Sequence, residues 1–472
     1  MATKRARRGR RRRGNGKPKR APRREPLPPG PTGLHHIPDH LLELVLLHVG
    51  SSLALLRAAF TCKRWRRIVS AAAFLARFRS LHAAHMPGHY HVVDPSFKEP
   101  PPDGSSNHVY VPDPSTADAI DRRRLALDFL PEGDRSLPWE LGDSRGGLLL
   151  LYRRNIVWHR MAYRTWYSEL HFSDMVVCDP LTRTYQTILC SDEAGSRLFL
   201  GVFLLDGVAV DESGGGFIAM SNFRVLAVGY ESHDFEDGRG TPRASVFSSG
   251  SEGGWQSAAE NVVSIPEYAS MSFAGRARSS LYWRMEREVV VLALDETTLE
   301  FSLVEFPCTV VGMPDESSAF RVIGGHDGAL RVVRVMVNND LTVFAQFRGS
   351  GEWVAEKLVR LPEATCGQPG REETYFQRPA KIVSASTRYI LVTPQEETWI
   401  VSVDLETLEV ERAHERNRYA GAAYPFELPW PPALQACRAA DRRCSRRVYV
   451  PPTFAYELLD GISNAPTCTG TS

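Results

Sequence analysis

The chain has 472 residues, enough for two or three domains, and its apolar fraction of 43% and charged fraction of 24% are typical of a soluble globular protein. No apolar run approaches the ~20 residues that cross a bilayer, and the eight cysteines contain no Cys-x-x-Cys pair, so we expect no membrane span and reduced thiols in a cytosolic or nuclear protein. The net charge of +2 is divided unevenly, because residues 1–24 hold 13 of the 57 Lys and Arg and no acid, which leaves an acidic body.

Residues 1–33 form a basic tail in which Arg and Lys runs alternate with Gly and Pro. Such a composition cannot bury a core, so we expect this tail to be disordered. Short basic runs are typical of nuclear-import signals and predict a nuclear protein with a cytoplasmic pool. The residues that would carry the signal are Arg10, Arg11, Arg12, Arg13, Lys17, Lys19 and Arg20. No aromatic residue is interleaved with them, so base stacking is not expected; a nucleic-acid-binding arm and a purely solubilising tail are the alternatives.

Residues 34–85 are predicted to form a small module of three short helices and a fourth helical stretch. Pro38 suits the first turn of the first helix, where its missing N–H costs nothing. From Leu41 to Val49 only Glu43 and His48 are polar, so this helix is apolar almost all round, whereas a surface helix shows one apolar stripe. A module this small is marginal alone. Its excess apolar surface therefore faces either a partner protein or the rest of the chain.

The same stretch resembles an F-box, a motif with a Pro-x-x-Leu-Leu start and a Cys-Lys-x-Trp-Arg end. The matching residues are Ile37, Pro38, Leu41, Leu42, Val45, Leu46, Leu55, Leu56, Arg57, Cys62, Lys63, Trp65, Arg66, Ile68, Val69 and Phe74. The resemblance implies docking onto the Skp adaptor, and through it the cullin, of a ubiquitin ligase. It assigns the adaptor contact to Ile37, Pro38, Leu41, Leu42, Val45, Leu46, Leu56, Cys62, Trp65 and Arg66.

Four histidines follow the helices, at His82, His85, His89 and His91. Two of the pair spacings would suit a metal ion, but no Cys or acidic residue joins them, and Pro87-Gly88 interrupts the stretch. We therefore expect no metal site here.

From about Tyr90 the apolar period changes from 3.6 to 2, and short β-type runs separated by polar turns dominate. Two turn types recur between them, an Asp-x-x-Thr turn at Asp179, Asp295 and Asp404 and a Gly-rich turn before Trp255 and Trp353. Repeats of roughly 40–50 residues built from hairpins indicate propeller blades, and loop insertions would lengthen them. We expect six or seven blades, with a pair of β-sandwiches as the alternative.

This layout resembles, loosely, the kelch-like or F-box-associated propellers that follow F-boxes in plant proteins. The predicted fold class is α+β multidomain, with the F-box module at 34–85, an all-β propeller-like domain at 86–460 and a disordered tail at 461–472. The strands expected to line the channel are Gly147–Tyr152, Phe223–Val228, Ala329–Val337 and Tyr389–Thr393.

No catalytic motif appears in the chain. Gly-x-Ser-x-Gly, Gly-x-x-x-x-Gly-Lys, Gly-x-Gly-x-x-Gly and His-Glu-x-x-His are all absent from the sequence. The carboxylate pairs Glu372-Glu373 and Glu396-Glu397 lie in turn-like polar stretches, and no pattern of converging His or acidic residues is visible on the expected channel strands. We expect a non-catalytic protein without a cofactor.

One stretch, Arg153 to Phe172, is dense in the residues that dominate binding surfaces. Its candidate substrate-binding residues are Trp158, Arg160, Trp166 and Tyr167. The alternative is that these aromatic residues pack between adjacent blades. The sequence as a whole predicts a substrate-receptor subunit of a Skp–cullin–F-box ubiquitin ligase that binds a protein substrate through its β domain. A nuclear nucleic-acid-binding protein and a propeller enzyme are the two rivals.

Overall fold

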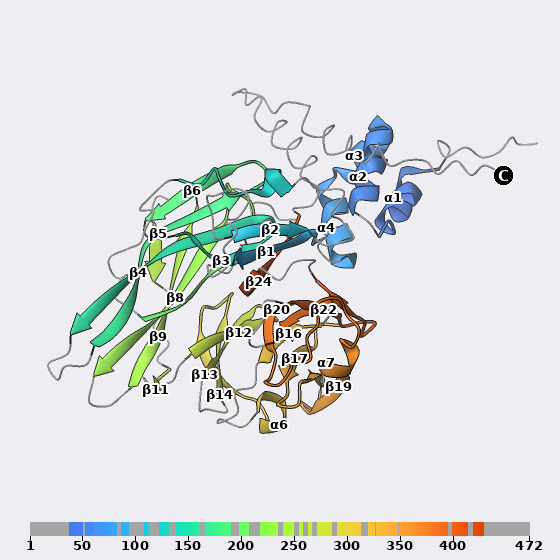
Figure 1. Cartoon of the computed structure of the whole chain (residues 1–472). Helices are drawn as coiled ribbons and strands as arrows, with labels where there is room; N and C mark the ends of the chain where they lie inside the picture. The colour runs from blue at the N-terminus through green and yellow to red at the C-terminus, as the bar shows by residue number, and fades with distance from the viewer. Residues whose placement is uncertain are drawn as a thin grey trace, which may run out of the picture.

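The computed structural model describes residues 37–428, except for residues 51, 83–85, 94–107, 113–121, 132–137, 161–165, 190–197, 207–217, 235–238, 250–253, 258–262, 267–270, 286–289, 313–319, 326, 348, 395–398 and 414–418. The predicted tails at 1–33 and 461–472, and with them the proposed import residues, lie outside this part. The described residues form a helical module followed by a ring of β-sheets (Figure 1).

Four helices make up the module, as predicted: α1 (Asp39–Leu47), α2 (Ser52–Thr61), α3 (Lys63–Val69) and α4 (Ala72–Leu81). Cys62 caps α3, since its Sγ accepts the backbone N–H of Trp65. The helices enclose one small core, formed by Leu42, Leu46, Leu47, Leu55, Ala59, Ile68, Val69, Phe74, Leu75 and Phe78. No helix in the described ranges is both long enough and apolar enough to cross a bilayer.

Five groups of four consecutive antiparallel strands follow the chain order, and we number them as blades. The third and fourth blades are joined in one eight-stranded sheet by a parallel pairing of their first strands at Gly275 and Val322. Blade one contains β3 (Glu140–Arg145), β4 (Leu148–Arg160), β5 (Trp166–Asp179) and β6 (Thr184–Leu189). Blade two contains β7 (Leu198–Leu205), β8 (Arg224–Asp234), β9 (Arg239–Ser248) and β10 (Trp255–Ser257), with the short β11 (Ile265–Pro266) beside β9. Blade three contains β12 (Met271–Ala277), β13 (Ser280–Met285), β14 (Val290–Asp295) and β15 (Phe301–Glu305).

The remaining strands complete the ring. Blade four contains β16 (Phe320–Gly324), β17 (Leu330–Val335), β18 (Asp340–Gln346) and β19 (Trp353–Arg360). Blade five contains β20 (Lys381–Ala385), β21 (Tyr389–Thr393), β22 (Val401–Asp404) and β23 (Val410–Arg412). Blade six combines the last strand, β24 (Tyr419–Phe426), with β1 (Gly88–Val93) and β2 (His108–Pro112). Short helical segments lie between blades: η2 (Arg122–Leu125), α6 (Cys308–Val311) and α7 (Leu361–Ala364).

The first strands of the blades stand in a closed circle. Successive inner strands β3, β7, β12, β16, β20 and β24 contact one another, and β24 contacts β3. The pairing of β24 with β1 joins the two ends of the β domain within one sheet. A closed ring removes two open sheet edges and explains why the sandwich alternative is wrong. The described structure is a six-bladed propeller.

The repeated turns of the sequence occupy one position in the ring. Asp179, Asp295 and Asp404 join the third and fourth strands of blades one, three and five, and each carboxylate accepts two backbone N–H bonds from the turn that follows. Trp255 and Trp353 begin the fourth strands of blades two and four. The five markers therefore fall on the same connection in five successive blades, which confirms the predicted repeat.

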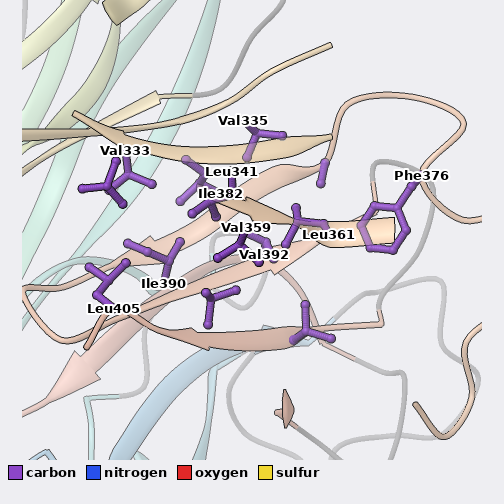
Figure 2. Packing of buried hydrophobic residues seen from close by; sticks show 14 of the residues in the cluster. Val333, Val335, Leu341, Val359, Leu361, Phe376, Ile382, Ile390, Val392 and Leu405 are labelled. Atoms are coloured by element: carbon purple, nitrogen blue, oxygen red, sulfur yellow. The ribbon is translucent and has the colours of Figure 1, made fainter. Parts of the chain in front are cut away.

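The prediction of the channel-lining strands is wrong. Each of the four predicted segments is the second strand of its blade, at β4, β8, β17 and β21. Second strands are covered on both faces by neighbouring blades and so read as continuous apolar runs. Figure 2 shows this packing between blades four and five, where Val333, Leu341, Ile382 and Ile390 lie in one buried cluster. Of the true inner strands, β3, β12, β16 and β20 carry charged residues, which weakens their apolar signal, whereas β7 is apolar apart from Gly201.

Candidate functional site

The helix α1 has two apolar faces with different surroundings. Leu42, Leu46 and Leu47 are almost fully buried in the core of the module. Leu41 and Val45 on the other face are 45% and 60% exposed. Within the described part of the chain this face is not covered, and an exposed apolar patch on a small module marks an interaction surface.

The structure sorts the residues assigned to adaptor contact. Pro38, Leu41, Val45, Cys62 and Arg66 are exposed on the module. Ile37 and Trp65 are partly buried and pack against the core, and the side chain of Leu56 lies outside the described part. For these residues the contact remains a prediction.

Leu42 and Leu46 require a correction. Each side chain is at most 2% exposed, so both belong to the core that holds the four helices together and are not available to a partner. The sequence analysis missed Leu44, which is 43% exposed. Helical spacing could have found it, because Leu41, Leu44 and Val45 follow the i, i+3, i+4 pattern of one face.

Ion pairs fix α1 against the other helices. The Asp39 carboxylate bonds to Arg64 at 2.6 Å and to Arg67 at 2.7 Å, which ties the start of α1 to α3. The Arg64 guanidinium, by hydrogen bonding, holds the pKa of Asp39 below its usual value. Glu43 pairs with Arg77 of α4 at 2.8 Å. The exposed apolar face is thus presented on a braced helix.

The dense aromatic stretch Arg153 to Phe172 is a β-ribbon. Strands β4 and β5 continue beyond blade one, with the register running from Arg154 opposite Phe172 to Arg160 opposite Trp166. Their blade neighbours stop earlier, because β3 pairs only as far as Tyr152. In Figure 1 the ribbon extends beyond the ring.

The predicted substrate-binding residues lie on this ribbon. Trp158 stands opposite Ser168 and His159 stands opposite Tyr167 in the register. The side chains of Trp158, Arg160, Trp166 and Tyr167 lie outside the described part, so their role remains a prediction.

Charged residues meet at one mouth of the channel, which the sequence analysis did not foresee. Arg276 of β12 bonds to Asp143 of β3 at 3.2 Å, to Glu296 and, at 2.7 Å, to the carbonyl oxygen of Leu204 in β7. Arg145 of β3 bonds to Asp206 at 2.6 Å and to Glu296 at 3.2 Å. The sequence shows no pattern of such a convergence, because these residues come from three blades that are far apart along the chain and meet only in the closed ring.

A further carboxylate reaches this mouth from blade six. Glu427, one residue beyond β24, accepts the N–H of Gly146 in the β3–β4 turn at 2.8 Å. Gly146 has φ of +57°, and a Cβ there would lie 2.3 Å from Ile218, so the turn requires glycine. Burial raises the pKa of Glu427 and of Asp143 above their usual values, against the lowering effect of the two arginines.

The network braces the ring. Its carboxylates are engaged by arginines or backbone N–H groups, and the bonds of Asp143, of Glu427 and of Arg145 with Glu296 each join one blade to another. Because these bonds join strands of different blades, the network helps to hold the ring closed.

Three described histidines near the junction hydrogen-bond within the protein. His82 hydrogen-bonds through Nε2 to the Leu47 carbonyl at 2.6 Å, and His89 hydrogen-bonds to the Tyr389 hydroxyl. His108 accepts the Leu141 N–H at 3.1 Å, and burial lowers its pKa to about 4. Among the described residues no group of three or more His, Cys, Asp or Glu side chains could hold a metal ion.

Comparison with known proteins identifies the helical module. A family model of the F-box domain matches residues 34–76, so this part of the chain is an F-box domain. The chain therefore combines an F-box with a six-bladed β-propeller. No curated protein matches it.

Three solved structures illustrate what the chain is similar to. The Aleuria aurantia lectin in complex with Fucα1-6GlcNAc is 13% identical, covers 64% of this chain and 83% of its own, and gives a TM-score of 0.32. Pseudomonas aeruginosa periplasmic gluconolactonase PpgL is 12% identical, the match covers 72% of this chain and 98% of that chain, and the TM-score is 0.34. The Myceliophteria thermophila Cps50 (Swd1) β-propeller domain is 9% identical, the match covers 62% of this chain and 92% of that chain, and the TM-score is 0.32. The ring assignment rests on the strand pairing described above.

Proposed function

We propose that this protein is the substrate-receptor subunit of a Skp–cullin–F-box ubiquitin ligase. The observation that carries the proposal is the outward apolar face of α1, formed by Leu41, Leu44 and Val45, on a module that family comparison identifies as an F-box. In this role the F-box binds the Skp adaptor, the propeller binds a protein substrate, and the chain itself catalyses nothing.

The geometry of the ring supports a receptor. The F-box precedes β1, which begins at Gly88 opposite Phe426, the last residue of β24. The next residue, Glu427, bonds to Gly146 in the β3–β4 turn, so the F-box joins the ring on the face that carries this turn. Strand β4 leaves the same turn and runs across the ring into the ribbon. The F-box and the ribbon tip thus lie on opposite faces of the ring (Figure 1).

This separation favours action by proximity. A substrate held on the face opposite the F-box is kept near the ligase at a high effective concentration, which is the whole contribution that a receptor makes to ubiquitin transfer. We place the substrate contact on the ribbon, at Trp158, Arg160, Trp166 and Tyr167, because rigid aromatic residues and arginine dominate binding surfaces.

The adaptor contact can be tested with exposed residues alone. Replacing Leu41 and Val45 together by Asp puts two charges into the apolar contact and should weaken Skp binding by at least ~100-fold, as loss of buried anchor residues does. The control is Leu303→Asp in β15 of blade three, whose leucine is also 45% exposed. Affinity would be measured by calorimetry, and folding by thermal unfolding.

The outcomes separate the proposal from its rivals. Loss of binding in the double variant, with an unchanged melting temperature and normal binding by the Leu303 variant, supports adaptor docking through α1. Undiminished binding by the double variant would remove the basis of the proposal.

A further inference from the structure

Blade six has one strand fewer than the other blades in the part of the chain that the structure describes. Its sheet has the order β24–β1–β2, whereas blades one to five each pair a fourth strand outside the third. β2 is nevertheless packed like a central strand. Val111 is buried in a cluster with Leu391 and Ile400 of blade five, and Tyr110 is buried with Tyr90 on the opposite face. An edge strand with two buried faces is a template for one more strand.

The direction of the chain fits a fourth strand drawn from the C-terminus. Gly88, Pro112 and Phe426 lie at one end of the sheet, because Gly88 pairs with both of the others. β2 runs toward this end, so an antiparallel neighbour must begin there. β24 also ends there, and residues 429–472 continue from it. The chain that leaves β24 is thus already at the correct end of the blade.

The C-terminal segment contains a suitable sequence. Val448-Tyr449-Val450-Pro451 repeats Val109-Tyr110-Val111-Pro112 of β2 residue for residue. Val and Tyr favour extended, half-buried strands, and the pair Pro451-Pro452 would end such a strand. Residues 429–447 can span up to roughly 60 Å, which is ample for the ~15 Å across three strand spacings.

We propose that residues 447–451 add to the outer edge of β2 as the fourth strand of blade six, antiparallel to β2. This blade contains both β1, which follows the F-box, and β24, which closes the ring. A fourth strand from the C-terminus would therefore fasten the closure a second time, beside the attachment of the F-box. Its release would loosen blade six before the other five.

Hydrogen–deuterium exchange on the full chain tests this proposal. Tyr449→Pro removes a backbone N–H and blocks strand pairing, so the β2 amides that point away from β1 should exchange at least tenfold faster than in the wild type. Glu457→Pro, in the same tail but outside the repeated tetrapeptide, is the matched control and should leave β2 unchanged. In the wild-type chain residues 447–451 should themselves be protected.

Three results would overturn the proposal. The first is unchanged protection of β2 in the Tyr449 variant, which would assign the edge to another segment such as residues 113–121. The second is unprotected exchange of residues 447–451 in the wild type. The third is protection that appears only as protein concentration rises, which would mean that the strand comes from a second copy of the chain.

Discussion

Adjacent side chains of α1 serve different purposes, and exposure rather than residue type separates them. Leu46 is 2% exposed and Val45 is 60% exposed, although they are neighbours in an unbroken apolar run. Core truncations lose both transfer free energy and packing, whereas truncation of an exposed side chain costs little. The same helix can therefore be tested for folding and for binding with different substitutions.

Truncation of the core residue should unfold the module. We expect Leu46→Ala to lower the free energy of unfolding of the F-box by about 2–4 kcal/mol, and Val45→Ala to change it by less than about 0.5 kcal/mol. Native-state hydrogen exchange of α1 to α4 measures both. Equal effects of the two substitutions would contradict the assignment of Leu46 to the core.

The Glu427 carboxyl provides a prediction about pH. Burial raises its pKa in the folded protein above its usual value, so the folded state holds this proton more tightly than the unfolded state does. The stabilisation that this proton provides is complete below the unfolded pKa and is lost as pH rises through the folded pKa. Glu427→Gln keeps an oxygen for the Gly146 N–H and removes the titration.

We therefore expect the stability of Glu427→Gln relative to wild type to improve as pH rises from about 4 toward 7. Urea unfolding of both proteins over this range measures the difference. Asp128→Asn, at an exposed ion pair with Arg183, is a control outside the channel network. A difference that stays constant with pH, or that favours wild type increasingly toward pH 7, would show that the arginines outweigh burial at this site.

At the scale of elements, β4 and β5 pair with each other far beyond their blade neighbours, for longer than β8 and β9 do in the next blade. Two-stranded ribbons are marginally stable alone. The side chains of this ribbon are therefore expected to be stabilised either by packing against the ring or by binding a partner. Within the described part, β3 pairs with β4 only from Leu148 to Tyr152, and β6 pairs with β5 only from Asp174 to Asp179. Beyond these residues β4 and β5 pair with each other alone.

Shortening the ribbon distinguishes these two cases. Replacing residues 155–171 by an Asn-Gly turn should leave the melting temperature within about 4 °C of wild type, which is equivalent to roughly 1–2 kcal/mol in a domain this large. The same replacement should abolish recovery of the substrate with the adaptor complex. Single Ala substitutions at Trp158, Arg160, Trp166 and Tyr167 locate the contact. If each variant that loses the partner also loses stability, these residues belong to inter-blade packing and the contact lies elsewhere.

At the scale of the whole molecule, charge is segregated along the chain. The basic residues of the first 24 positions precede a body in which acidic residues are in excess. Because opposite charges attract over about 8 Å at physiological salt, such a tail can also associate with its own body. Its proposed role in nuclear import must therefore be separated from a general effect of charge.

A fluorescent fusion lacking residues 1–24 should shift from the nucleus toward the cytoplasm. A second fusion with Arg10 to Arg13, Lys17, Lys19 and Arg20 replaced by Ser should behave like the deletion, while one that keeps these residues and shuffles the Gly and Pro between them should remain nuclear. Microscopy of the three proteins gives the answer. An unchanged distribution in all of them would leave the tail a solubilising role.

The sequence alone determined the local features, because each rests on a short-range signal. The F-box is read from Pro38, Cys62 and Trp65, and the helices from their apolar pattern. The blade repeat is read from turns such as that at Asp179, whose carboxylate bonds within the next three residues. Turn chemistry and apolar periodicity depend on fewer than ten neighbouring residues, so they can be recognised without knowledge of the fold.

Only the tertiary structure decided how these pieces meet. The exact blade count depends on β24 pairing with β1, more than 300 residues away in sequence, and no local signal encodes such a pairing. The same holds for the charges at the channel mouth, where Asp143, Arg276 and Glu427 come together from three blades. The division of α1 into a core face and an open face likewise follows from the packing of α2 to α4 on one side. Burial is a property of the whole assembly, so apolar character by itself could not separate Leu46 from Val45.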